Sequence, residues 1–346
     1  MGQHLCCAYF ACGCQRCIFV VYNRPGYYNS NKDLTAKQLY KAICAQSPDL
    51  PVFLQYWWLD AVVGKWDVAI SMKGQAITGV WPYAIQNRLR VEMLRNPPLT
   101  AYLGPHVFFP EDIKESNRDN FEHEVITQLI DQLPNCDVWK LSVQPGLKQA
   151  GIFKDYELAI TVQQTFLIDL NETEEVLFSN MKEPLRRNIR AAEKEFEISD
   201  DPNCLDALFR FQKVTLEDKG TEQHYDFEQV NRLFDACRIH NSTALWVAKK
   251  EGVAQAVIWN VWDGERSYYF MGAKNPEADS YRAMSALLWH SIKEAKKRGN
   301  RFFDLEGSMD PGVERFFRSF GGKRELYMVL KKNQSLLWRL IEMVKK

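Results

Sequence analysis

The sequence lacks both a net charge and a long apolar segment. Its 346 residues contain 44 Lys and Arg and 44 Asp and Glu, so the formal net charge at pH 7 is zero. Balanced charge argues against bulk electrostatic attraction to nucleic acid or to a membrane, although local basic faces are still compatible with it. No run of about 18 uncharged apolar residues occurs, so we find no candidate transmembrane helix. We expect a soluble, cytoplasmic protein.

The sequence also lacks paired metal-ligand motifs. Five of its nine cysteines lie within the first 17 residues, where Cys14 and Cys17 form a C-x-x-C motif. No second C-x-x-C motif and no His pair at a suitable spacing accompanies it. Residues 1–33 show no usable periodicity, so we expect a disordered, cysteine-containing leader, and a metal site there is the alternative. We therefore expect no bound metal.

The chain as a whole is 46% hydrophobic, which is enough to bury large cores and excludes disorder as its main state. Single cores stop growing near about 250–300 residues, so two domains are expected. Each half contains a predicted strand hairpin, over residues 67–85 with a turn at Gly74 and over 244–262 with a turn at Glu251-Gly252. In each half a helix and a buried strand follow, which suggests two copies of one α/β unit.

Apolar periodicity places the remaining elements. We expect helices over residues 34–46, 54–63, 116–133, 172–178, 186–195, 227–239, 284–298 and 334–344. We expect buried strands over 137–143 and 300–305, and further strands over 88–94, 161–170 and 267–273. Asp169 or Asn171 is expected to cap the helix over 172–178.

Two carboxylates lie at the end of the last predicted buried strand. Asp304 and Glu306 are two positions apart and therefore point to the same face of the sheet. Ligands of open α/β sheets bind beyond the carboxyl ends of strands, and a carboxylate there can accept a proton from a reacting amine. The alternative is a structural role in which they cap the turn at Gly307-Ser308.

Three motifs of the second half occur in a fixed order. They are P-L-R-R-N-I-R-A-A-E-K over residues 184–194, F-D-L-E-G-S over 303–308 and G-V-E-R-F-F-R-S-F-G-G over 312–322. They resemble the R-x-N-I-R-K-A-E-K helix, the D-F-x-G strand end and the G-l-x-x-F-K-x-x-F-G segment of the Fem-type family of tandem GNAT transferases. The resemblance covers residues 35 to 330.

The resemblance implies an α/β fold of two tandem GNAT-like units with mixed sheets flanked by helices. We place the units at residues 34–160 and 161–346, with the last helix packing back on the first unit. The implied reaction is attack of an amine on an activated acyl or aminoacyl group, carried by acyl-CoA or aminoacyl-tRNA as co-substrate, without a tightly bound cofactor. The acceptor is then a small-molecule amine, such as a cell-envelope precursor. A non-catalytic protein that binds a nucleotide-linked or envelope ligand is the alternative.

The resemblance also implies roles for several cations. Arg318 stands where the family usually has Lys, and it is expected to stabilise an oxyanion. The family's helix over residues 184–194 carries Arg186, Arg190 and Lys194, which either bind phosphate or form a solvated face paired with acids. The segment 280–285 lacks the glycines of an acyl-CoA-binding turn, but Arg282 within it can still hold a phosphate.

Four further residues are candidates for the substrate cleft. Tyr268 and Tyr269 point to opposite faces of a strand, and we assign Tyr269 to the ligand, where its phenol can protonate a leaving group. His224 lies in a polar loop and either borders the acceptor pocket or is an ordinary loop residue. Tyr102 and His106, in a loop rich in Pro and Gly, are expected to line the acceptor cleft between the two units.

Overall fold

The computed structural model describes residues 35–47, 49–278, 281–307 and 309–344. The helices are α1 (Ala36–Gln46), α2 (Tyr56–Val62), α3 (Glu115–Ile130), α4 (Ala150–Asp155), α5 (Glu174–Ser179), α6 (Glu183–Ala192), α7 (Leu205–Asp218), α8 (Phe227–Ile239), α9 (Tyr281–Arg298), α10 (Pro311–Arg318) and α11 (Leu336–Val344), with the 3₁₀ turns η1 (Val52–Leu54) and η2 (Pro202–Cys204). The strands are β1 (Asp67–Lys73), β2 (Ala76–Tyr83), β3 (Ile85–Arg88), β4 (Val91–Arg95), β5 (His106–Val107), β6 (Val138–Ser142), β7 (Ala159–Asp169), β8 (Glu197–Asp200), β9 (Thr243–Lys250), β10 (Val253–Trp262), β11 (Arg266–Lys274), β12 (Phe302–Asp304) and β13 (Lys323–Asn333).

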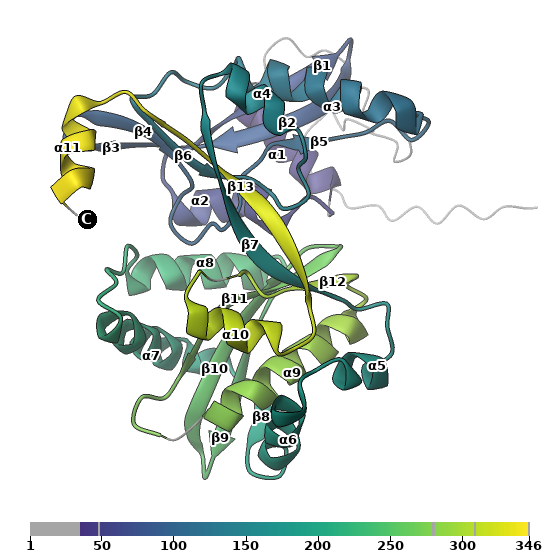
Figure 1. The fold of residues 1–346 in the computed structure, drawn as a ribbon, viewed down its shortest axis with the longest axis vertical. Coiled ribbons are helices and arrows are strands. Elements are labelled where there is room, and N and C mark those ends of the chain that lie inside the picture. The colour runs from purple at the N-terminus through teal and green to yellow at the C-terminus, as the bar shows by residue number, and fades with distance from the viewer. Residues whose placement is uncertain (1–34, 48, 279–280, 308, 345–346) are drawn as a thin grey trace, which may run out of the picture.

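These strands form two sheets (Figure 1). One has three strands in the order β1-β2-β5, and the other has ten in the order β3-β4-β6-β13-β7-β12-β11-β10-β9-β8. The pairs β4–β6 and β11–β12 are parallel and the other neighbours are antiparallel, so the large sheet is mixed. Helices flank the strands, as the sequence predicts, and the α/β fold class is confirmed.

The two predicted hairpins form, but they sit in different surroundings. In the second half, β9 and β10 are inner strands of the ten-stranded sheet. In the first half, β1 and β2 belong to the small sheet, and the chain enters the large sheet only at β3, after Ala84. Pro82 lies near this point and has no N–H to donate to a ladder, which suits a strand that is about to leave its sheet.

One strand joins the two halves. The long strand β13 pairs with β6 of the first half over Val329–Asn333 and with β7 over Lys323–Lys331. It crosses the molecule between the two groups of helices (Figure 1). Sequence analysis did not predict this strand, and its pairing makes the large sheet continuous through both halves. The unit boundary near residue 160 therefore stays a prediction.

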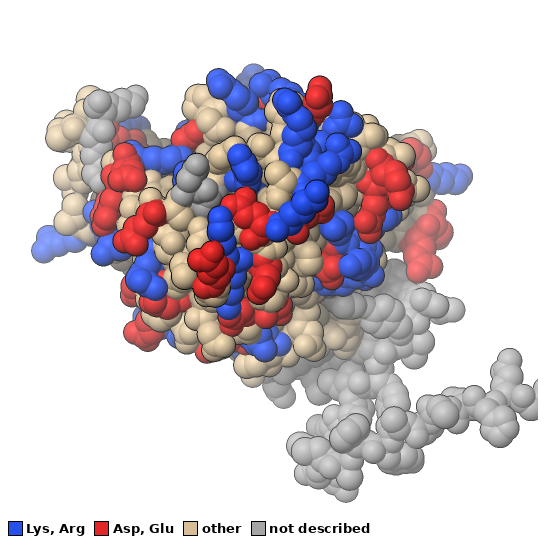
Figure 2. Space-filling model, turned by 90° about the horizontal axis from the view of Figure 1, so that it is seen from below, with Lys and Arg blue, Asp and Glu red and all other residues tan. Residues whose placement is uncertain are grey.

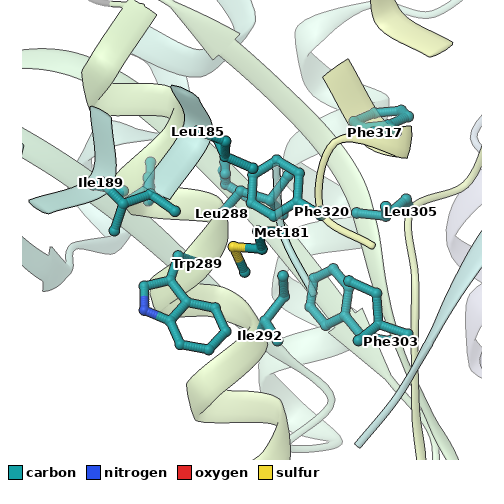
Figure 3. Close-up of a cluster of buried hydrophobic side chains, with 14 of the residues drawn as sticks. Met181, Leu185, Ile189, Leu288, Trp289, Ile292, Phe303, Leu305, Phe317 and Phe320 are labelled. Atoms are coloured by element: carbon teal, nitrogen blue, oxygen red, sulfur yellow. The ribbon is translucent and has the colours of Figure 1, made fainter. Parts of the chain in front are cut away.

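The core of the second half lies between the sheet and α6, α9 and α10 (Figure 3). Leu185, Ile189 and Ala192 recur at helical spacing on α6 and are buried against α9. Phe317 and Phe320, in and just after α10, reach the same cluster from the other side. The apolar side chains of the family motifs thus form the hydrophobic core, while their polar residues point elsewhere.

Side chains cap the N-termini of α8 and α5. Helix α8 begins with a capping box in which Asp226 and Gln229 bond each other's backbone. The cap predicted for α5 was wrong, because Thr173 rather than Asp169 or Asn171 accepts the bond from Val176 N. Asp169 instead accepts a bond from the backbone of Asn171 in a local turn.

The last helix packs on the first half of the chain. Trp338 of α11 lies against Val91, Met93 and Val138, and Figure 1 shows α11 beside β3 and β4. The predicted leader and its C-x-x-C motif lie outside the described residues. Within the described ranges, no group of His, Cys, Asp and Glu is suited to a metal ion, and no helix is long and apolar enough to cross a membrane.

Candidate functional site

The two carboxylates at the end of β12 lie in a buried polar cluster. Asp304 is fully buried and accepts hydrogen bonds from the Thr165 hydroxyl and, at 2.8 Å, from the Glu306 backbone N–H. The guanidinium of Arg266 lies 3.4 Å from its other oxygen. Burial raises the pKa of Asp304, and Arg266 and the hydrogen bonds oppose that rise. Three donors therefore hold Asp304 in one orientation.

Glu306 differs from Asp304 because one of its oxygens is left without a partner. Its Oε1 is buried and accepts no hydrogen bond from any described residue. Burial, and then the neighbouring charge of Asp304, raise the pKa of Glu306 well above its usual value. The structure thus brings the two predicted carboxylates together, and Glu306 is the one with capacity to exchange a proton.

A tight turn sets the position of Glu306. Glu306 and Gly307 both have positive φ, 51° and 40°. A Cβ on Gly307 would lie 1.8 Å from the carbonyl oxygen of Gln164, so only glycine fits. Leu305 N donates to Phe166 O at 3.0 Å just before the turn. The backbone of β7 therefore fixes the end of β12 and the position of Glu306.

Strands β11 and β12 separate at the same place. Their parallel register runs from Arg266–Phe302 to Tyr268–Asp304, after which β11 continues to Lys274 paired, among the described strands, only with β10. The β10–β11 ladder skips Phe270, which forms a bulge in β11. The carboxylates thus lie where two parallel strands diverge, as expected of a ligand site in an α/β sheet.

A cavity of about 220 Å³ lies beside the cluster, between the two halves. The first half contributes Tyr102, His106 and Gln144 to its lining, and the second contributes Asp263, Arg266 and Tyr268 among others. Arg266 both lines the cavity and contacts Asp304. The cavity wall and the carboxylate cluster are therefore parts of one arrangement.

Asp263 and His106 are titratable groups of this cavity with shifted pKa values. Burial raises the pKa of Asp263 to about 6, although it accepts bonds from Arg266 N, Val52 N and the Tyr268 hydroxyl. Burial lowers the pKa of His106 to about 4, so its imidazole is neutral at pH 7. Such shifts recur where buried titratable groups serve a site.

Tyr102 connects the cavity to the carboxylates. It lines the cavity, and its buried hydroxyl has no hydrogen-bond partner among the described residues. Burial, followed by the charges of Asp304 and Glu306, raises its pKa far above 10. Its ring packs edge-on against Tyr327, with centroids 4.9 Å apart. Tyr102 is therefore a protonated donor next to the two carboxylates at every physiological pH.

Two residues of the predicted site lie away from this cluster. Arg318, the last residue of α10, is 48% exposed, and its Nε is 3.9 Å from Glu314. No contact joins Arg318 to the carboxylates within the described part of the chain. Tyr269 points to the opposite face of β11 and packs against Phe317 with centroids 5.3 Å apart, while its neighbour Tyr268 lines the cavity.

The predicted phosphate-binding residues lie elsewhere, on and just after α6 and at the start of α9. Arg282 lines a polar pocket of about 310 Å³ with Lys250 and Gln255, and its guanidinium lies 3.9 Å from Glu195. Lys194 is exposed at the end of α6, and Arg190 stacks over Phe178 at 5.2 Å. Seen from below, basic side chains gather at the top of the view with acidic ones beside them (Figure 2).

Arg186 and His224 complete the predicted set. Arg186 is half-buried on α6, and its buried Nε has no partner among the described residues. His224 is exposed in the loop before α8, 4.0 Å from Glu222, and does not line the cavity. Sequence reasoning missed Asp263 and Arg266. The D-G-E-R turn at 263–266, between two predicted strands, was the available signal.

Comparisons with known proteins bear on the fold. Residues 179–318 match the family model described as an acetyltransferase (GNAT) domain. The structure is similar to that of FemX over 90% of this chain and 99% of FemX, with a TM-score of 0.62 and 12% identity. It is also similar to the C-terminal domain (DUF2156) of a putative lysylphosphatidylglycerol synthetase from Agrobacterium fabrum. That likeness covers 88% of this chain and 94% of the other, with a TM-score of 0.53 and 13% identity. No curated protein sequence matches the chain.

These comparisons define the class of the protein. The chain has the fold of FemX, and residues 179–318 of its second half match the GNAT acetyltransferase domain. The resemblance read from the three sequence motifs is thereby confirmed. Identities of 12 and 13% establish the fold alone, so the activity has to be argued from the site.

Proposed function

We propose that the protein is an acyltransferase that moves an acyl or aminoacyl group from an activated donor, acyl-CoA or aminoacyl-tRNA, to an amine. The observation that carries the proposal is the position of Glu306 and Tyr102. Both have an unpartnered polar atom. Glu306 follows β12 where that strand diverges from β11, and Tyr102 lines the cavity between the halves. The GNAT domain assigned to residues 179–318 supports the same reaction class.

Each polar residue then has a role in the transfer. The amine nitrogen attacks the carbonyl carbon of the donor, and Glu306 takes the proton that the nitrogen loses. The bond from carbon to the leaving oxygen or sulfur breaks as the Tyr102 hydroxyl donates its proton to the leaving group, and the proton on Glu306 restores Tyr102. A raised pKa brings Glu306 closer to that of the group it deprotonates. Asp304 and Arg266 position this pair.

The cavity lining favours a cationic or amino-bearing acceptor. Asp49, Asp263 and Glu265 border the cavity together with the single guanidinium of Arg266. Carboxylates attract an ammonium group before it loses its proton, and they raise its local concentration. We assign the acceptor to this cavity and the phosphates of the donor to the polar pocket at Arg282 and Lys250.

Two observations favour a second candidate function, in which the protein binds such ligands without transferring a group. Arg318 is paired with Glu314 instead of facing the cavity. The segment that begins α9 has no glycine that would bring its backbone close to a pyrophosphate. Both features affect the donor or the oxyanion and leave the acceptor cavity intact.

The test is a mass-spectrometric transfer assay with the full-length protein. Acyl-CoAs and charged tRNAs are supplied as donors, with diamines, amino acids and amino sugars as acceptors. We expect a mass gain on an amine, and a rate about 10²–10⁴ times lower for Tyr102→Phe. Tyr83→Phe, which changes a tyrosine outside the cavity lining, is the matched control.

The outcomes separate the two functions. Transfer that Tyr102→Phe lowers and Tyr83→Phe does not supports the acyltransferase. Stabilisation of the protein by an amine, without any mass gain on it across the donor panel, supports binding alone and overturns the acyltransferase proposal. Equal rates for both variants overturn the role given to Tyr102.

A further inference from the structure

Three cations form a row across the large sheet, away from the carboxylate cluster. Arg95 of β4 is the register partner of Lys140 in β6, and Lys140 is in turn the partner of Lys331 in β13. Neighbouring strands lie about 4.8 Å apart, so the three side chains leave the same sheet face side by side. Arg95 is half-buried, and Lys140 and Lys331 are exposed.

These cations have no counter-ion within the described part of the chain. None of the three makes an ion pair or a side-chain hydrogen bond there. The nearest acid is Glu342 of α11, whose carboxylate is already bonded by Trp338 Nε1 and Asn333 Nδ2, each at 3.2 Å. Glu342 therefore offsets the positive charge of the row only in part.

The row is unfavourable in the protein by itself. Like charges on directly paired residues destabilise a sheet. Burial and then the charges of Arg95 and Lys331 lower the pKa of Lys140, and Glu342 opposes this effect. Other surface cations, such as Lys250 and Arg232, have a carboxylate at 2.8 Å or less. Cations that lie side by side without a counter-ion, and that solvent can reach, are suited to binding an anion.

Helix α11 makes this face a corner instead of a flat surface. Trp338 covers Val91, Met93 and Val138. Val91 and Met93 precede Arg95 on β4 by four and two residues, and Val138 precedes Lys140 on β6 by two, so all three lie on the same face as the cations. The row is therefore bordered by a helix on one side and open on the other. An anion in the corner can contact two or three cations at once, which gives more affinity than a single surface lysine.

We propose that Arg95, Lys140 and Lys331 form a binding site for a phosphate group, in which one phosphate or diphosphate contacts at least two of the three cations. The group can belong to a soluble organic phosphate or to a phospholipid headgroup, and the chemistry of recognition is the same. The site is separate from the acceptor cavity, and it does not depend on acyl transfer.

The test measures phosphate binding and stability together in the full-length protein. Calorimetric titration with pyrophosphate and with a nucleoside diphosphate tests the soluble source. Co-sedimentation with vesicles of phosphatidylglycerol, against phosphatidylcholine alone, tests the headgroup. We expect Lys140→Gln and Lys331→Gln each to weaken binding about tenfold, because a charge-assisted contact is lost. Lys65→Gln removes an exposed lysine elsewhere and is the matched control.

The same variants have a second signature. Because Lys140→Gln relieves repulsion, we expect the ligand-free variant to unfold at a higher temperature than the wild type, while pyrophosphate stabilises it less. Binding of either probe that falls in the row variants but not in Lys65→Gln supports the site and identifies its source. Absence of binding to the soluble phosphates and to the phosphatidylglycerol vesicles, or equal binding by all variants, overturns the proposal.

Discussion

The two faces of the strand pair β11–β12 can be compared residue by residue. Arg266, Tyr268 and Asp304 lie on one face, where Arg266 and Tyr268 line the cavity, Arg266 pairs with Asp304 and Tyr268 bonds Asp263. Their neighbours Tyr269 and Phe303 point to α9 and α10 and are packed in the hydrophobic core. The two faces share one backbone, so the difference comes from alternation alone. We infer that substitutions on one face change chemistry, whereas those on the other change stability.

The largest effect is expected for Glu306→Gln. Gln keeps the shape of the side chain but cannot accept the proton, so we expect the transfer rate to fall about 10²–10⁴-fold. The free energy of unfolding should not fall, because the variant removes a buried carboxyl group whose pKa is raised. Single-turnover kinetics and urea denaturation measure the two quantities. Glu157→Gln, at an 83% exposed glutamate, is the control. A fully active Glu306→Gln would remove Glu306 from the mechanism.

Phe303→Ala tests the opposite face. Phe303 is fully buried among Phe317, Phe320 and the side chains of α9, so its truncation leaves a cavity. We expect the free energy of unfolding to fall by about 3–5 kcal/mol, with little change in the rate constant of the molecules that stay folded. Denaturation monitored by circular dichroism gives the first value, and activity per folded molecule gives the second. A rate loss as large as that of Glu306→Gln would break the division between the faces.

Gly307→Ala tests the turn that follows β12 and positions Glu306. The new Cβ would meet the Gln164 carbonyl in a backbone of positive φ, so we expect a loss of about 2–4 kcal/mol. Gly252 also has positive φ but faces open space, and Gly252→Ala should cost only about 1 kcal/mol. Thermal unfolding of the two variants compares them directly. Equal losses would mean that the contact with β7 contributes nothing to the position of Glu306.

The smallest effect concerns pH. The pKa of Asp263 is raised from 3.8 to about 6, so the folded state binds more protons and stability falls as pH rises through this window. The pKa of His106 is lowered from 6.5 to about 4, so the unfolded state binds more protons and stability rises with pH. The two contributions oppose each other between about pH 4 and pH 6 in the wild type.

Single variants should separate these contributions. From pH 4 to pH 6, Asp263→Asn should gain about 2 kcal/mol of stability relative to the wild type, and His106→Gln should lose a similar amount. Urea denaturation at several pH values gives the slopes, which are compared instead of the absolute stabilities. Parallel slopes in all three proteins would show that neither group titrates as its surroundings require.

Local sequence patterns account for most of the elements. The hairpin of β9 and β10 was readable because its alternation and its turn depend on neighbours in the chain. The strand β13 was missed because Lys323-Arg324-Glu325 opens it with three charged residues, and its partners β6 and β7 are far away in sequence. Pairing with distant strands, rather than propensity, makes this segment a strand.

In the candidate site, too, features that depend on neighbours in the chain could be predicted and those that depend on distant residues could not. Asp304 and Glu306 could be located because a buried strand followed by a Gly turn marks them. The hydrogen bond from Val52 N to Asp263 and the effect of the carboxylates on the pKa of Tyr102 could not be read, since they join residues from both halves of the chain. The place of Arg318 in a family motif suggested a role at the site, yet the helix that carries it packs on the opposite face.

The path of β13 also bears on how the protein is made. Ser142 pairs with Val329, so the first half cannot complete its sheet until almost the whole chain has left the ribosome. Until then the edge of β6 opposite β4 stays unpaired. Bringing β13 to it closes a long loop of the chain, which slows folding. Unpaired edges of this kind attract other chains. We therefore expect the first half to expose this edge of β6 until β13 pairs with it.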